Sequence, residues 1–260
     1  MIVPSEPLLR LLAIMQTLRD PQRGCDWDRT QTFDSIASYT IEEAYEVGDA
    51  IGRCDMRELQ EELGDLLLQV VFHSQIAAEA GAFTFADVAQ GIADKMTARH
   101  PHIFGEDDAA MSSERWEELK ALERNRKGST SALDGVARAL PALMRAEKLQ
   151  KRAARDGFDW PDPSGPEAKL LEELVEFTGA EDAGDRLEEA GDLLFAAVNL
   201  LRKHDIDAEA ALRQANEKFE RRYRGMEKVA GGSFGSLSLD EQEKLWSAVK
   251  LQERRRPPQV

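Results

Sequence analysis

Apolar residues recur along the chain at intervals of three and four, a spacing that places them on one face of a helix. Thr84 and Ser113 precede such stretches as expected N-cap residues, and Gly81 is an expected helix stop. Alternating β-branched residues are nearly absent, which argues against a large sheet. The pattern predicts an all-α protein made of helical bundles. The helices of the first half are expected within residues 8–18, 41–51, 63–76, 85–99 and 113–124.

The second half of the chain repeats short phrases of the first half in the same order. Trp27 corresponds to Trp160 and Asp65 to Asp192, at offsets of 160 − 27 = 133 and 192 − 65 = 127 residues. Offsets that differ by a few residues are what loop insertions and deletions leave after a tandem duplication. The paired phrases are RGCDWD and DGFDWP, IEEAYE and LEELVE, EELGDLL and EEAGDLL, KMTAR and KFERR, and WEELK and WSAVK.

We therefore expect two tandem-duplicated helical-bundle domains, residues 1–124 and 139–260, joined by a linker over residues 125–138. The linker contains NRKGSTSALDG, which is small, polar and bears glycines, as linkers commonly are. A second segment, WPDPSGPEAK from Trp160, holds prolines and a glycine, and we interpret it as a loop that opens the second acidic helix.

Acidic residues three positions apart lie on one face of a helix, and the first copy has two such pairs. Glu43 and Glu46 form one pair, and Glu62 and Asp65 form the other on the next helix. The short turn between the helices makes them antiparallel neighbours, so the two acidic rows can face each other. Converging carboxylates repel one another, and a cation relieves that repulsion. Oxygen-only ligands at this density suit Mg²⁺ or Mn²⁺.

The second copy repeats the arrangement, and the repetition decides between two interpretations. One Glu-x-x-Glu match on a helix rich in Ala and Leu is usually a solvated face. Two matched sets, each with a glycine before the aspartate, favour a metal site. Gly64 and Gly191 each cost about 1 kcal/mol in a helix interior, which suggests close backbone approach or room for a ligand. The acidic residues of the second copy are Glu173, Glu176, Glu189 and Asp192.

Basic and aromatic residues follow each acidic hairpin at matched positions. The pairs four residues apart could hold phosphate oxygens, and each Trp with its following Lys could stack a base and contact a phosphate. Taken singly, these residues are more often exposed ion pairs and core tryptophans. Asn216 is a weaker ligand contact. The matched residues are Lys95, Arg99, Trp116 and Lys120 in the first copy, and Lys218, Arg222, Trp246 and Lys250 in the second.

The charge balance limits the partners, since 49 acidic residues outweigh 34 basic ones and the net charge is −15. Such a surface repels nucleic acid and anionic membranes, so neither is an expected partner. The apolar stretch from Leu66 to Ala78 is too short to span a bilayer. Cys25 and Cys54 lack a C-x-x-C spacing, which indicates reduced thiols in a cytoplasm.

These residues resemble those of the MazG family of nucleoside triphosphate pyrophosphohydrolases over nearly the full chain. The order of the motifs fits the two-domain members. The resemblance implies an all-α fold, a tight homodimer and Mg²⁺-dependent hydrolysis, with Mn²⁺ as a possible substitute. The substrate would be an NTP or dNTP, cleaved between the α and β phosphates to NMP or dNMP and pyrophosphate. Matching stretches include YTIEEAYEVGDAI, ELGDLLLQVVFHSQIA, RHPHIFG, LPALMRAEKLQKRAARDGFDW, EEAGDLLFAAVNL and ANEKFERR.

Carried over, the metal ligands are the eight acidic residues above, and Lys169 joins the substrate contacts of the second copy. Tyr39 is the strict counterpart of Lys169 in the first copy, with Ser38 beside it, so the second copy is favoured as the working one. Glu42 and Glu172 stand next to the ligand rows and are candidate general bases.

Two rival interpretations were weighed against this one. A di-iron bundle requires Glu-x-x-His pairs as iron ligands, and none of the four histidines has a Glu three residues earlier. A non-catalytic acidic scaffold or regulatory protein that binds nucleotides or partners stays open, although it gives no reason for the repeated basic and Trp motifs. Base and sugar preference, the number of metal ions and the physiological role stay open as well.

Overall fold

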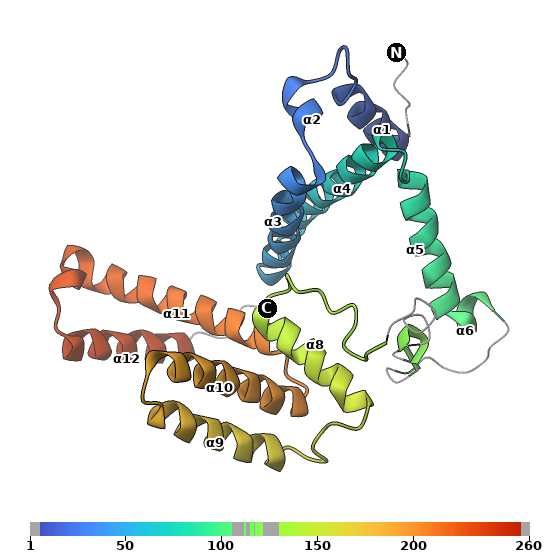
Figure 1. The fold of residues 1–260 in the computed structure, drawn as a ribbon. Coiled ribbons are helices and arrows are strands. Elements are labelled where there is room, and N and C mark those ends of the chain that lie inside the picture. Colours follow the sequence, from blue (N-terminus) through green and yellow to red (C-terminus); the bar gives the residue numbers. More distant parts are fainter. Residues whose placement is uncertain (1–5, 106–111, 113–114, 117, 122–129, 256–260) are drawn as a thin grey trace. The chain divides into compact units, whose positions relative to one another are not determined.

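The computed structural model describes residues 6–105, 112, 115–116, 118–121 and 130–255. Every regular element in these ranges is a helix, which confirms the all-α prediction (Figure 1). The chain divides into two compact units, Met1–Glu123 and Arg124–Val260. Among the described helices, none is both long and apolar enough to cross a membrane. Of the helix expected over residues 113–124, the described residues 115–116 and 118–121 are helical, and the expected N-cap Ser113 lies outside the described residues.

The first unit is organised around two long helices that follow each other along the chain. Helix α3 lies against α4, and α1 and α5 each pack on α4 (Figure 1). Thr84 caps α5 as expected, because its hydroxyl accepts from the backbone N–H of Asp87. Gly81, at φ +68°, follows the end of α4. The bounds are α1 Pro7–Leu18, α2 Asp26–Thr30, α3 Phe33–Gly52, α4 Met56–Glu79, α5 Phe85–Arg99 and α6 Pro101–Phe104.

The core of the first unit lies at the end of α4 that is remote from its acidic residues. Met15 of α1, Ile36 of α3 and Val71, Phe72 of α4 are almost fully buried there. A buried guanidinium closes this end, since Arg19 pairs with Glu79 at 2.7 Å and also donates to backbone carbonyls near α2. The core thus holds α3 and α4 at one end and leaves their acidic segments at the other.

The second unit repeats the long hairpin and also contains a hairpin of two further helices. Helix α9 lies against α10, α8 packs on α10, and α11 pairs with α12 (Figure 1). Residues 132 and 134 of the expected linker contact α8 through hydrogen bonds from Arg152 to their carbonyls, at 2.9 and 2.8 Å. The bounds are α8 Ala142–Arg155, α9 Ser164–Gly179, α10 Ala183–Lys203, α11 Ala208–Ala230, the 3₁₀ helix η1 Gly231–Ser236 and α12 Leu239–Arg255.

The two acidic hairpins have the same local design. Three residues join α3 to α4 and three join α9 to α10. Asp55 caps α4 and Asp182 caps α10, each accepting backbone N–H groups with its carboxylate. The interpretation of WPDPSGPEAK as a loop is wrong for its second half, because α9 already begins at Ser164. Pro166 lies in the first turn of α9, where a missing N–H costs nothing.

Much of the apolar face of these hairpins is exposed within its own unit. Ile41 on α3 and Leu63 on α4 are each 50% exposed, although their spacing predicted burial. On the second hairpin the exposed fractions reach 69% at Val175 and 77% at Leu187. Exposed apolar faces of this extent are typical of surfaces that associate with other protein.

Candidate active site

The first acidic site lies on the facing surfaces of α3 and α4. Carboxylate oxygens of Glu43, Glu62 and Asp65 lie within 4.8 Å of one another. Glu46 stands one turn further along α3, and its carboxylate helps to raise the pKa of both Glu43 and Glu62. The expected meeting of the two rows is therefore present in the geometry, with three carboxylates in direct reach of one ion.

Repulsion among these carboxyl groups is visible in their pKa values. Burial, followed by the charges of Asp65 and Glu46, raises the pKa of Glu43. Burial and the charge of Glu46, with that of Asp65, raise the pKa of Glu62. A divalent cation between the rows would offset these charges, and oxygen-only donors are the ligands that Mg²⁺ and Mn²⁺ take in proteins. The donor set therefore fits such an ion.

The second acidic site lies between α9 and α10, with two of its closest carboxylates on the first helix and one on the second. Carboxylate oxygens of Glu173, Glu176 and Glu189 lie within 4.8 Å of one another. Glu173 is only 4% exposed, which is rare for a carboxylate without a partner. Burial and the charge of Glu176 raise the pKa of Glu189, and burial and the charge of Glu173 raise that of Glu176. Asp192 lies outside the closest three but adds to the repulsion felt by Glu189.

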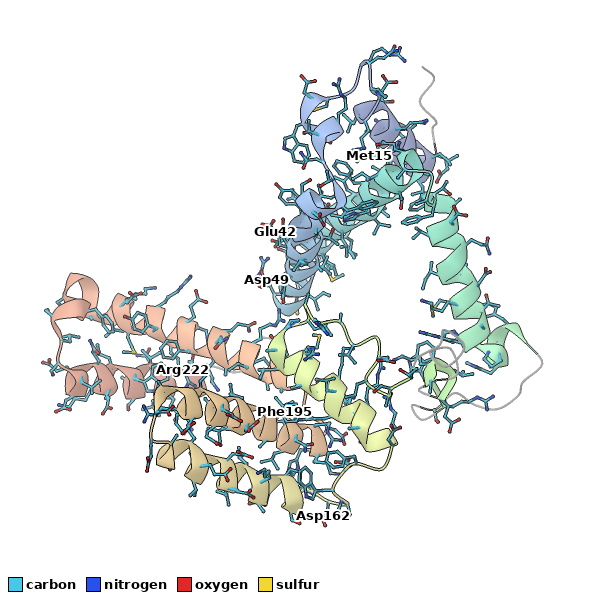
Figure 2. The ribbon with its side chains drawn as sticks, viewed as in Figure 1. Met15, Glu42, Asp49, Asp162, Phe195 and Arg222 are labelled. Carbon is cyan, nitrogen blue, oxygen red and sulfur yellow. The ribbon has the colours of Figure 1, made fainter. Side chains whose placement is uncertain are left out.

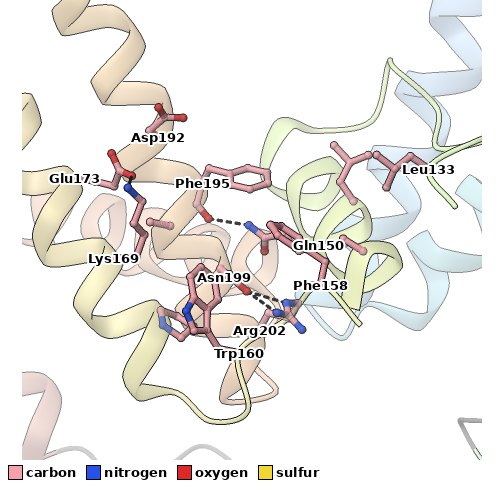
Figure 3. Close-up of a pocket in the computed structure, with 14 residues that line it drawn as sticks. Leu133, Gln150, Phe158, Trp160, Lys169, Glu173, Asp192, Phe195, Asn199 and Arg202 are labelled. Carbon is pink, nitrogen blue, oxygen red and sulfur yellow. Dashed lines mark hydrogen bonds and ion pairs between the residues drawn. The ribbon is translucent and has the colours of Figure 1, made fainter. Parts of the chain in front are cut away.

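An ammonium group enters the second site and accounts for the burial of Glu173. Lys169 Nζ lies 2.6 Å from Glu173 Oε1 (Figure 3) and 2.8 Å from Glu172 Oε1. These bonds raise the pKa of Lys169, so the cation is held firmly at neutral pH. Both candidate general bases, Glu42 (Figure 2) and Glu172, are exposed. Glu172 shares the ammonium of Lys169, whereas Glu42 forms no hydrogen bond or ion pair in the described residues.

The basic and aromatic residues meet in the same way in both units. The guanidinium of Arg99 lies 5.3 Å above the ring of Trp116, and that of Arg222 lies 5.3 Å above the ring of Trp246. Equal stacking at duplicated positions supports the alignment of the two halves. Lys95 and Lys120 are half-buried, and Asn216, Lys218 and Lys250 are exposed.

The arginine–tryptophan pair of the second unit forms a cluster of its own. Arg222 pairs with Glu253 at 2.7 Å, and Phe219 lies 5.6 Å from the ring of Trp246. In the part of the chain that the structure describes, no hydrogen bond or ion pair joins this cluster to the acidic rows of α9 and α10. The residues predicted to bind one substrate therefore lie in two groups, one acidic and one basic. In the first unit, His100 lies 5.2 Å from Trp116, ring to ring, with its Nδ1 2.7 Å from the Met96 carbonyl.

A cavity of about 490 Å³ opens beside the second acidic row, and no motif in the sequence predicts it directly. Glu173 and Asp192 line one side, and Trp160 and Gln150 line another (Figure 3). The sequence marks Trp160 only as a repeated residue. A tryptophan repeated just before each acidic helix was the available clue, because burial alone does not require the same residue in both copies.

The repeated glycines do not serve close packing within the chain. A methyl group added at Gly64 or at Gly191 would meet no atom within 4 Å, apart from neighbouring residues and backbone of the same helix. Of the two interpretations drawn from the sequence, close backbone approach is therefore wrong within the chain. The other interpretation, that the glycine leaves room for a ligand beside each acidic row, stays a prediction.

Comparison with known proteins identifies the class of enzyme. Residues 31–104 match the family model described as the MazG nucleotide pyrophosphohydrolase domain. The chain is 50% identical to the nucleoside triphosphate pyrophosphohydrolase of Escherichia coli (strain K12), over 94% of this chain and 97% of the relative. These matches indicate a hydrolase of nucleotide anhydride bonds and set aside the non-catalytic scaffold.

The particular family follows from the full-length matches. The nucleoside triphosphate pyrophosphohydrolase/pyrophosphatase MazG of Thermotoga maritima is 44% identical over 92% of this chain and 94% of its own length. A nucleoside triphosphate pyrophosphohydrolase of Mycolicibacterium smegmatis is 37% identical over 60% of this chain. The chain belongs to the MazG family, as the motifs of its sequence predicted.

Proposed function

We propose that the protein is a Mg²⁺-dependent nucleoside triphosphate pyrophosphohydrolase. It hydrolyses an NTP or dNTP between the α and β phosphates and releases NMP or dNMP and pyrophosphate. The observation that carries this proposal is a cluster of three carboxylates between the two acidic helices of each unit. Glu43 and Glu62 of the first cluster correspond to Glu173 and Glu189 of the second, while the third member differs. The names of the full-length relatives point to the same substrate class.

The acidic rows are the proposed metal ligands, and Mn²⁺ is an acceptable substitute because it takes the same oxygen donors. Bound there, Mg²⁺ offsets the charge of the phosphates and makes water more acidic. The ligand residues are Glu43, Glu46, Glu62 and Asp65 in the first copy, and Glu173, Glu176, Glu189 and Asp192 in the second.

The remaining residues of the proposed site have separate roles in the reaction. Glu172, and Glu42 in the first copy, accept the proton of the attacking water. Lys169 leaves the carboxylates of Glu172 and Glu173 and donates to a phosphate oxygen of the substrate. Arg222 and Lys218 hold the charge that develops on the departing pyrophosphate. Trp246 with Lys250 completes this cluster, and Lys95, Arg99, Trp116 and Lys120 are its counterparts in the first copy.

The second copy is the proposed working site. Lys169 supplies a cation at a position where the first copy has Tyr39, which is neutral at pH 7. A triphosphate brings several negative charges to a row that is already acidic, so a built-in ammonium lowers the cost of binding it.

A homodimer and a cytoplasmic location complete the proposal. The exposed apolar faces of the acidic hairpins, with Val175 and Leu187 as their most exposed members, need a cover of similar chemistry, and a second copy provides one. Association would also allow a basic cluster to approach an acidic row. Cys25 and Cys54 are exposed and unpaired, which fits a reducing compartment. The net charge of −15 disfavours nucleic acid and membrane as partners.

The test is a panel of ribo- and deoxyribonucleoside triphosphates with Mg²⁺, with Mn²⁺ or with a chelator. Pyrophosphate and orthophosphate are measured separately, because cleavage between the β and γ phosphates would release orthophosphate. We expect pyrophosphate alone, and only with a metal. A control that carries Glu62→Gln and Glu189→Gln together should release neither. Metal-independent release, or release by the control, would contradict the proposal.

A further inference from the structure

The cavity beside the second acidic row has the size and walls of a ligand site. Its volume of about 490 Å³ falls within the range of roughly 300–1,000 Å³ that is usual for small-molecule pockets. Phe158, Trp160 and Phe195 give it aromatic walls, while Glu173 and Asp192 form the side that adjoins the metal ligands (Figure 3). A ligand that spans both parts needs an apolar ring at one end and a group that binds metal at the other.

One polar atom in this cavity lacks the partner that its burial requires. Gln150 is 7% exposed, and its Nε2 donates to the Phe195 carbonyl at 2.8 Å. Its Oε1 is buried and accepts no hydrogen bond from the described residues. A buried acceptor without a donor is costly. The Oε1 atom is therefore an available acceptor for an N–H group of a ligand.

In a second amide of the cavity, that of Asn199, the oxygen is occupied and the nitrogen is available. Asn199, which is 8% exposed, accepts from Arg202 with its Oδ1 at 3.0 Å. Because the oxygen is occupied, the Nδ2 group is the part of this amide that can still donate. The cavity thus offers one acceptor, at Gln150, and one donor, at Asn199.

The aromatic wall is held in place by the same helix that carries the acidic residues. Asp159 pairs with Arg202 at 2.6 Å, and Lys203 donates to the Trp160 carbonyl at 2.6 Å. The indole of Trp160 lies directly over Gly165, where an added Cβ would approach the ring to 2.0 Å. Gly165 is therefore required for this position of the ring.

We propose that this cavity holds the nucleobase of the substrate. Trp160 stacks on the base, and Gln150 Oε1 accepts from a base N–H, while the phosphates extend to the acidic row past Lys169. Every common nucleobase carries an N–H donor and an acceptor, so this pair of amides selects for a base as such rather than for one base. The assignment rests on the proposed function, because it takes a nucleotide as the ligand.

The corresponding region of the first unit could not take a base. A cavity of only about 110 Å³ lies there, lined by Trp27, Tyr39, Phe72 and Gln69. The ring of Trp27 contacts both Tyr39 and Phe72, at centroid distances of 6.5 and 6.4 Å. By the offsets of the duplication, Tyr39 and Phe72 stand where the second copy has Lys169 and Asn199 (72 + 127 = 199). Two aromatic rings thus fill the space that the second copy leaves open.

The experiment compares substrates with and without a base. In a background that carries Glu62→Gln and Asp65→Asn, so that only the second copy works, Gln150→Met removes the acceptor and keeps the length of the side chain. We expect kcat/KM for the best of ATP, GTP, CTP and UTP to fall about tenfold. Pyrophosphate release from ribose 5-triphosphate, which has no base, should stay within about twofold. Gly165→Ala, which displaces Trp160, should give the same selective loss.

Two controls make the result decisive. Gln69→Met removes a buried unpaired amide oxygen of the first unit and should leave kcat/KM unchanged for substrates with and without a base. Calorimetric titration of the same variants with the four nucleotides and with inorganic tripolyphosphate repeats the comparison without turnover. An equal loss on substrates with and without a base would reveal a structural role and overturn the proposal, as would unchanged nucleotide affinity in Gln150→Met. Failure of the wild type to release pyrophosphate from any nucleotide would instead refute the proposed function.

Discussion

The two acidic rows use the same residue types, yet only the second contains a cation of its own. In the second row Lys169 bonds to Glu173 and Glu172, whereas Tyr39 stands at that position in the first. In the described part of the first unit, no ion pair reaches Glu43, Glu62 or Asp65, and like charges help to raise the pKa of Glu43 and Glu62. The comparison teaches that a duplicated set of carboxylates is not a duplicated site, because the residues around them decide what charge each site accepts.

The second copy, which holds the built-in cation, also has the larger cavity. About 490 Å³ is open beside the second row and about 110 Å³ beside the first. Tyr39 contributes to both differences, since it replaces a cation and also contacts Trp27. A single position therefore separates the copies in electrostatics and in shape.

Removal of a proposed metal ligand should show the largest difference in activity between the two copies. Glu189→Gln leaves the size of the side chain but removes a charge from the second row, and we expect kcat/KM to fall by roughly 10²–10³-fold. The matched Glu62→Gln in the first row should change it by less than about twofold. Pyrophosphate release with Mg²⁺ measures both. A larger loss in Glu62→Gln would mean that the first copy is the working site.

Exchange of the residue that differs should have the next largest effect. Lys169→Tyr gives the second copy the residue of the first, and we expect a loss of about 10- to 100-fold because one charged donor to the phosphates is gone. The reciprocal Tyr39→Lys, measured with Glu189→Gln to silence the second copy, should raise the activity of the first copy. Equal rates for Lys169→Tyr and the wild type would remove the electrostatic basis of the comparison.

The raised carboxyl pKa values predict how pH and Mg²⁺ change stability. The folded chain keeps protons on Glu43, Glu62, Glu176 and Glu189 to a higher pH than the unfolded chain, whose glutamates titrate at 4.5. Their contribution to stability is therefore present at and below pH 4.5 and is lost as pH rises through the raised values. Mg²⁺ should reverse this loss, by about 2.7 kcal/mol at a concentration of 100 times its Kd.

Thermal unfolding with and without Mg²⁺, at several pH values above 4.5, measures this effect. The shift caused by Mg²⁺ should grow with pH, because protons compete with the ion for the same oxygens. It should be smaller in Glu43→Gln, and smaller again when Glu176→Gln is added. A shift that does not depend on pH would indicate that Mg²⁺ binds elsewhere.

The smallest expected effect concerns the repeated glycines. An added methyl group at Gly64 or at Gly191 faces open space, so each change to Ala should stabilise its helix by about 0.5–1 kcal/mol. Chemical unfolding measures the gain, and the two substitutions should agree. Loss of stability at one of them would show that a second chain approaches that helix, which would sharpen the comparison by locating an interface on one copy only.

The sequence predicted the helices and the meeting of the acidic rows because both depend on local spacing. Glu62 and Asp65 share a helical face wherever their helix lies, and a three-residue turn forces it against its neighbour. Lys169 and Glu173 lie four residues apart on one face of α9, yet the prolines nearby favour the interpretation of that segment as a loop. The prediction overlooked that a helix accepts proline in its first turn.

The cavity could not be predicted in this way. Gln150, Trp160 and Asn199 come from α8, a loop and α10, and only the packing of these elements brings them together. Their side-chain orientation depends on hydrogen bonds between elements, such as that from Gln150 to the Phe195 carbonyl. No periodicity in the sequence records such contacts. The same holds for the separation of the basic cluster from the acidic rows.

The carboxylate of Glu253 binds two arginines at once, and this changes what it costs to recruit one of them. Arg222 lies 2.7 Å from one oxygen and Arg221 lies 2.9 Å from the other. In the proposed reaction Arg222 would turn toward an incoming phosphate, and Arg221 would stay with Glu253 as its counterion. Glu253 would then keep a partner throughout, and Arg222 could return to it once the proposed pyrophosphate product has left.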